Sequence, residues 1–121
     1  MKKTLIVLVV GILAVGCLTS EQKQKALRDS VVGEYEGKGD GNTFKYVYLE
    51  NGVYEHYNNG KKDAETTWSI VDGETHVKSS SGFIYVHRIN TDKSITYIAK
   101  IVDGKRIDAS KHHQSTYKKI K

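Results

Sequence analysis

The side chains that could do chemistry in this chain are few and widely spaced. No two histidines stand two apart, as a strand metal site needs, or four apart, as a helical one needs. Serines 79–81 precede Gly82 and read as a polar turn, and no G-x-S-x-G motif occurs. The histidines are His56, His76, His87, His112 and His113. We therefore predict no enzyme, no metal site and no cofactor.

The one cysteine, Cys17, follows an apolar run. It could be a reactive thiol, a packing residue or an attachment point, but it cannot form a disulfide within the chain. Lys2 and Lys3 precede the apolar residues 5–15, which is the pattern of an export signal. Eleven apolar residues are too few for a spanning helix, which needs about 20. The segment therefore predicts export rather than a permanent membrane helix.

The sequence Ala14-Val15-Gly16-Cys17 resembles the lipobox of bacterial lipoproteins. The resemblance implies that residues 1–16 are removed before Cys17 and that its sulfur carries a diacylglycerol. The chain would then be a lipoprotein of the cell envelope, on the outer membrane if the host has two. Ala14 stands where this family usually has Leu, and Ala14 with Gly16 also suits the ordinary signal peptidase. Simple secretion is therefore the alternative.

After the cysteine, residues 17–30 are mostly polar, and they predict a lipidated tether with a short helix near 21–30. The alternative is a helix that packs against the end of the following domain. That domain, residues 31–121, alternates polar and apolar residues in short segments rich in Val, Ile, Tyr and Thr. Four turn pairs separate many of them: Asn51-Gly52, Asn59-Gly60, Asp72-Gly73 and Asp103-Gly104.

These features predict an all-β domain of eight or nine strands, antiparallel between sequence neighbours. Open edges promote aggregation, so we expect a small up-and-down barrel or a strongly curved meander. Residues 31–77 also resemble the opening of small bacterial lipocalin-like domains. The matching positions are Gly33, Tyr35, Tyr48, Gly52, Tyr54, Trp68 and Gly73. This resemblance implies a small barrel on a lipid tether and does not specify a ligand.

Tyrosine is the most suggestive residue type, with eight copies among the 121 residues. The alternation places five aromatic side chains inside the barrel as candidate ligand contacts: Tyr46, Tyr48, Tyr54, Trp68 and Tyr97. These side chains either fill the barrel or line a cup for a small amphipathic ligand. Because the barrel is short, we expect a filled interior.

The net charge of +5 is a mild basic bias. Without Lys2 and Lys3, the 19 Lys and Arg fall to 17 against 14 Asp and Glu, a net charge of +3. Residues 105–121 hold six Lys or Arg and one Asp, which would suit either anionic envelope polymers and lipid head groups or an edge strand protected by lysines. Export argues against nucleic acid. We predict a non-catalytic binding or interaction module for another envelope component, with a carrier or sensor of a small hydrophobic ligand as the alternative.

Overall fold

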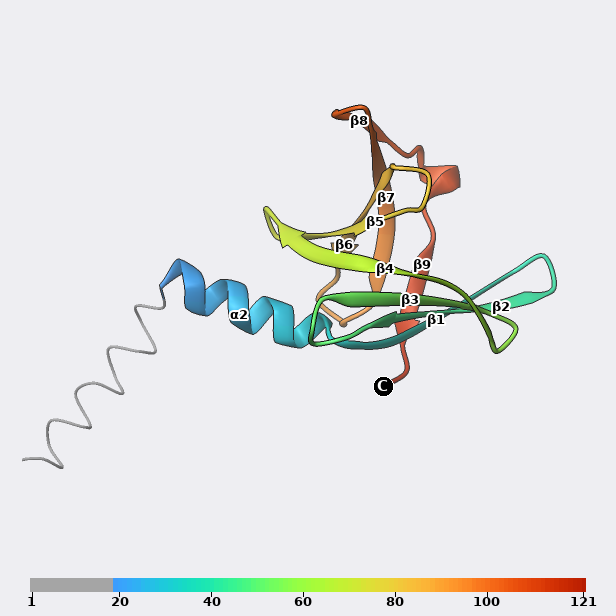
Figure 1. The fold of residues 1–121 in the computed structure, drawn as a ribbon, viewed down its shortest axis with the longest axis horizontal. Helices are drawn as coiled ribbons and strands as arrows, with labels where there is room; N and C mark the ends of the chain where they lie inside the picture. The colour runs from blue at the N-terminus through green and yellow to red at the C-terminus, as the bar shows by residue number, and fades with distance from the viewer. Residues whose placement is uncertain (1–18) are drawn as a thin grey trace, which may run out of the picture.

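A computed structural model describes residues 19–121, so Cys17 and the predicted signal segment lie outside the described residues. The described residues form one α-helix followed by nine strands, with a short 3₁₀ helix before the last strand (Figure 1). The elements are α2 (Ser20–Val31), β1 (Gly33–Gly39), β2 (Asn42–Tyr48), β3 (Val53–Asn58), β4 (Lys61–Val71), β5 (Glu74–Lys78), β6 (Ile84–Ile89), β7 (Ile95–Val102), β8 (Lys105–Asp108), the short 3₁₀ helix η1 (Lys111–His113) and β9 (Thr116–Lys119). The predicted all-β class is confirmed.

Eight of the strands close into an antiparallel barrel. Strands β1 to β7 pair in sequence order, and β9 lies between β7 and β1 and closes the ring. The closing edge of β7 is shared, since β9 pairs with its residues 95 and 96 while β8 pairs with its residues 99–102. Strand β8 is therefore an extra strand outside the barrel.

The turn pairs form most of the hairpins, as predicted. Asn59, Asp72 and Asp103 have φ angles of 51°, and the glycines that follow them have φ angles of 77–83°. The fourth pair differs, because only Gly52 (φ 88°) is in the left-handed region and the Asn51 side chain accepts a hydrogen bond from the Val53 amide. That connection is a longer turn, from Leu49 to Gly52, closed by a backbone hydrogen bond.

Helix α2 begins with a capping box that the sequence analysis had not identified. The Thr19 hydroxyl accepts from the Gln22 amide, and the Gln22 side chain accepts from the Thr19 amide. The C-terminal half of α2 packs on the barrel, because Val31 is buried in the core and Leu27 contacts it. The helix is therefore more than a tether, and the alternative of packing against the barrel end holds for this half.

The core gathers at the end of the barrel that α2 covers. Its buried residues are Val31, Tyr35, Tyr48, Tyr54, Trp68, Ile70, Val77 and Ile95. Polar contacts also join the helix to this end. The Gln24 side chain donates a hydrogen bond from Nε2 to the Ile70 carbonyl, and the Arg28 guanidinium lies 4.3 Å from the centre of the Trp68 ring. This core and all nine strands lie within residues 19–121, so that segment holds a complete folding unit.

Candidate functional site

The two ends of the barrel differ. Strand alternation puts the β2–β3, β4–β5 and β6–β7 connections at the end covered by α2. The β1–β2, β3–β4, β5–β6 and β7–β8 connections lie at the opposite end, away from the helix (Figure 1). Residues 79–81 of the β5–β6 connection line a cavity, so the cavity opens at the end opposite to α2.

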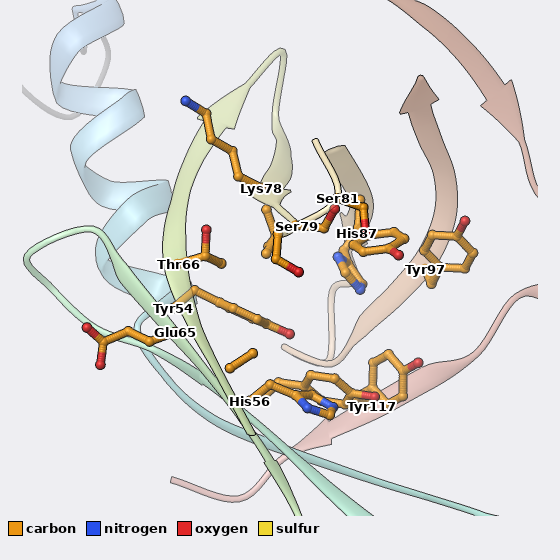
Figure 2. Close-up of a pocket in the computed structure, with 15 residues that line it drawn as sticks. Tyr54, His56, Glu65, Thr66, Lys78, Ser79, Ser81, His87, Tyr97 and Tyr117 are labelled. Carbon is orange, nitrogen blue, oxygen red and sulfur yellow. The ribbon is translucent and has the colours of Figure 1, made fainter. Parts of the chain in front are cut away.

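This cavity has a volume of about 560 Å³ and a mainly aromatic wall (Figure 2). Its lining residues are Tyr46, Tyr54, His56, Ala64, Glu65, Thr66, Val77, Lys78, Ser79, Ser80, Ser81, Tyr85, His87, Tyr97 and Tyr117. The charged side chains among them, Glu65 and Lys78, belong to exposed residues. The serines stand beside Lys78 at the rim, so polar groups concentrate at the mouth and aromatic rings inside.

Three of the five aromatic residues predicted from the sequence line this cavity: Tyr46, Tyr54 and Tyr97. The other two belong to the packed core. The Tyr48 hydroxyl shares a 3.2 Å hydrogen bond with Thr75, and the Trp68 indole donates to the Leu49 carbonyl at 2.9 Å. The expected filled interior is therefore correct for the helix end and wrong for the open end.

Small residues make room for the aromatic wall of the open end. Strand β1 places Tyr35 in the core but continues inward with Gly37 and Gly39, which have no side chain. The Tyr117 ring lies directly on Gly37, where an added Cβ atom would be 2.4 Å from Cδ1 of the ring. Ala64 of β4, which pairs with His56, lines the cavity with only a methyl group.

The cavity wall is a continuous aromatic cluster. Tyr46 is its centre, with ring-to-ring distances of 4.3 Å to Tyr117, 4.9 Å to His56 and 6.4 Å to Tyr54. Burial raises the pKa of the Tyr46 and Tyr54 phenols well above the usual value. These hydroxyls therefore stay protonated near neutral pH, and the wall offers uncharged polar groups.

One imidazole of the wall, His56, is paired with a carboxylate. Strand β4 has an extra residue, Asp63, opposite the step from His56 to Tyr57 in β3. This bulge brings Asp63 Oδ1 to 2.5 Å from His56 Nδ1. A carboxylate-oriented histidine also occurs in hydrolases, but there it activates a nucleophile. Within the described residues, no hydrogen bond joins His56 to a cavity serine.

The other imidazole of the wall, His87, was not identified as a site residue from the sequence. It is 6% exposed and lies on β6, opposite Tyr97 of β7. Its Nδ1 atom is enclosed and has no hydrogen-bond partner among the described residues. Burial lowers the pKa of this imidazole to about 4. The sequence did contain one signal for His87. Tyr85 and His87 are two residues apart in a strand, so their side chains lie on the same face.

We expect His87 to make the fold sensitive to acid. Above pH 6.5 the imidazole is neutral in both the folded and the unfolded chain and has no effect. As the pH falls from about 6.5 to about 4, the unfolded chain binds a proton that the folded chain resists, so stability decreases by up to about 3 kcal/mol. Urea unfolding at pH 7.5, 5.5 and 4.5 measures this loss. A His87→Phe chain should show a smaller loss over this range, and an identical pH profile would refute the assignment.

The remaining histidines do not form a metal site. Within residues 19–121, no three His, Cys, Asp or Glu side chains gather as metal ligands would. His112 and His113 are exposed on η1, where His113 Nδ1 lies 2.7 Å from the Ser110 hydroxyl. The adjacent pair therefore sits on the surface, away from the cavity lining.

Some of the basic C-terminal residues make contacts within the fold, and the others are exposed to solvent. Arg106 of β8 reaches Glu74 of β5 at 2.9 Å and also Asp108. Lys119 of β9 donates to the Ser30 carbonyl at the end of α2. Lys105, Lys111, Lys118 and Lys121 are exposed. The cationic stretch is therefore not a single binding surface.

No protein-family model matches the chain, and comparisons with curated proteins and with solved structures gave no match either. The strand pairing of the structure shows the barrel, and the resemblance to lipocalin-like domains stays a prediction. Over the described residues, no helix has the length and apolar character needed to cross a membrane.

Proposed function

We propose that this protein is a lipoprotein of the cell envelope, anchored through Cys17, whose barrel is a non-catalytic module that binds a small amphipathic ligand. The observation that supports it best is the cavity of about 560 Å³ at the end of the barrel opposite to α2. Its volume is within the range of small-molecule sites, about 300–1,000 Å³. Between the two predicted alternatives, the cavity favours a carrier or sensor over a purely surface-binding module.

The distribution of polar groups supports an amphipathic ligand. Aromatic side chains such as Tyr46, Tyr54 and Tyr97 give a flat apolar wall with hydroxyl groups at the ring edges. Lys78 and the serines 79–81 stand at the exposed mouth, whereas the Glu65 carboxylate is paired with Lys62 and points away from the cavity (Figure 2). A ligand with an apolar body would contact the aromatic wall, and its polar group would contact the polar side chains at the mouth.

The position of the helix bears on where the ligand comes from. If Cys17 is lipidated, α2 stands between the bilayer and the closed end of the barrel, and the mouth lies at the far end. A 12-residue helix is about 18 Å long. Exchange would therefore take place with another envelope component or with the aqueous space, rather than with the anchoring bilayer.

A cavity-filling substitution tests the binding function. Thr66 and Thr67 are neighbours on β4, but Thr66 pairs with Tyr54 and lines the cavity while Thr67 is exposed on the other face. Wild-type residues 19–121 should bind the uncharged dye N-phenyl-1-naphthylamine with increased fluorescence. Thr66→Trp should weaken this binding at least about tenfold, because indole occupies the space and every 1.4 kcal/mol of lost contact is tenfold.

Thr67→Trp is the matched control and should bind the dye as the wild type does. Circular dichroism should show a folded β protein for both variants. The proposal fails if the wild-type domain does not bind the dye, or if Thr66→Trp and Thr67→Trp bind it equally well.

A further inference from the structure

The polar group that stands out in this cavity is His87. Its imidazole projects among the side chains of the wall, near Tyr54, Tyr97 and Tyr117 (Figure 2). The ring centres of Tyr97 and Tyr117 lie 5.8 and 6.1 Å away. His87 is 6% exposed, and within residues 19–121 its Nδ1 atom has no hydrogen-bond partner, so the side chain has an unpaired buried polar atom. Because the protein encloses Nδ1, Nε2 is the ring nitrogen that is left for a ligand in the cavity.

We propose that His87 is the specificity-determining contact of the cavity and donates a hydrogen bond from Nε2 to an oxygen acceptor on an uncharged ligand. Carbonyl, ether and hydroxyl oxygens are the acceptors of this class. The inference rests on the proposed binding function and names the chemistry of its ligand.

The surroundings of the ring select the tautomer. A neutral imidazole carries one proton, on Nδ1 or on Nε2. A proton on Nδ1 would meet no acceptor, because that atom is enclosed without a partner. The proton is therefore assigned to Nε2, which is not among the enclosed unpaired atoms of residues 19–121 and belongs to a side chain that lines the cavity.

The electrostatics of the cavity select a ligand without charge. Burial keeps the His87 imidazole neutral at pH 7, since its pKa is about 4. The phenols of Tyr46 and Tyr54 are uncharged at pH 7 as ordinary phenols are, and burial raises their pKa further. A carboxylate or ammonium group placed at His87 would lose its hydration without gaining a counter-charge, which is strongly unfavourable.

Three small probes that differ in one substituent test this inference. They are 2-acetylnaphthalene, which has a carbonyl acceptor, 2-ethylnaphthalene, which has none, and 2-naphthoate, which is anionic. We expect ¹⁵N-labelled residues 19–121 to bind the acetyl compound most tightly and 2-naphthoate least. In His87→Phe, the preference for acetyl over ethyl should fall about five- to tenfold, as expected for one hydrogen bond.

The matched control is His76→Phe, on the neighbouring strand. His76 pairs with Val86 on the opposite face of the sheet and does not line the cavity, so its replacement should leave the preference unchanged. A second measurement does not depend on any variant. The ¹⁵N shifts of the wild-type His87 ring should report a proton on Nε2, and the Nε2 signal should move when 2-acetylnaphthalene binds.

The outcomes separate the two proposals. If none of the three probes binds the wild-type domain, the binding function itself fails and the inference fails with it. If the probes bind but His87→Phe keeps the full preference for the acetyl compound, the inference alone is overturned. It is also overturned if Nδ1 carries the proton or if 2-naphthoate binds as tightly as the acetyl compound.

Discussion

A Cys17→Ser chain is expected to lose all lipid incorporation and to disappear from the mature, membrane-bound fraction. The chain has one cysteine, so no other sulfur can take up the diacylglyceryl group. Two or three acyl chains, at about 0.8 kcal/mol per buried methylene, hold a small domain stably on a bilayer, and without them the domain has no such anchor. The variant should be found as an unprocessed precursor or in the soluble fraction. Labelling with alkyne-tagged palmitate and cell fractionation measure both changes.

A chain carrying Cys17→Ser together with Ser80→Cys is the matched control. It keeps one thiol, at an exposed position on the cavity rim, but not in the lipobox. Palmitate labelling should stay at background in this chain. Recovery of the wild-type protein from the medium with a free Cys17 thiol would show ordinary secretion instead and would contradict the lipid anchor.

Replacing Trp68 with alanine is expected to destabilise the barrel by about 3–5 kcal/mol, the usual cost of removing a buried large aromatic side chain. Trp68 is 4% exposed and meets the Tyr48 ring edge to face at 5.1 Å. It also receives Arg28 of the helix on its ring face. Domains of this size are stable by about 5–15 kcal/mol, so the variant should be close to unfolding at 37 °C. Urea unfolding followed by circular dichroism measures the loss.

Two further variants make this experiment specific. Trp68→Phe keeps an aromatic ring but removes the hydrogen bond to the Leu49 carbonyl, so it should lose less stability than Trp68→Ala. Ser69→Ala, at the exposed neighbouring position, should change stability by less than about 0.5 kcal/mol. A loss below about 1 kcal/mol for Trp68→Ala would mean that the helix end is not the main core.

The fold could be predicted because its signals are local. Alternation over five to nine residues identified strands, and pairs such as Asp72-Gly73 marked the hairpins, since both residues adopt left-handed conformations there. The order of the last strands could not be predicted in this way. Strand β9 closes the barrel and β8 does not, because residues 95 and 96 of β7 pair with β9. That choice depends on contacts between distant residues.

The candidate site was predicted only in part for the same reason. Alternation correctly placed Tyr46, Tyr54 and Tyr97 inside, but it could not distinguish the packed end of the barrel from the open end. The bulge at Asp63, which orients His56, leaves no mark in the sequence pattern. His87 was missed because it has no second histidine at a metal-ligand spacing, and its alternation with Tyr85, which puts both on one face of β6, was not used.

The sequence by itself determined the strands, their antiparallel hairpins and a specific hypothesis about Cys17, since each of these depends on residues next to one another in the chain. Only the tertiary structure decided that α2 covers one end, that Gly37 makes room for the Tyr117 ring of the cavity wall at the other end, and that His87 lines this cavity with an Nδ1 atom unpaired within residues 19–121. The physical reason is that a cavity depends on the summed volumes of side chains from many strands, and no short stretch of sequence contains that sum.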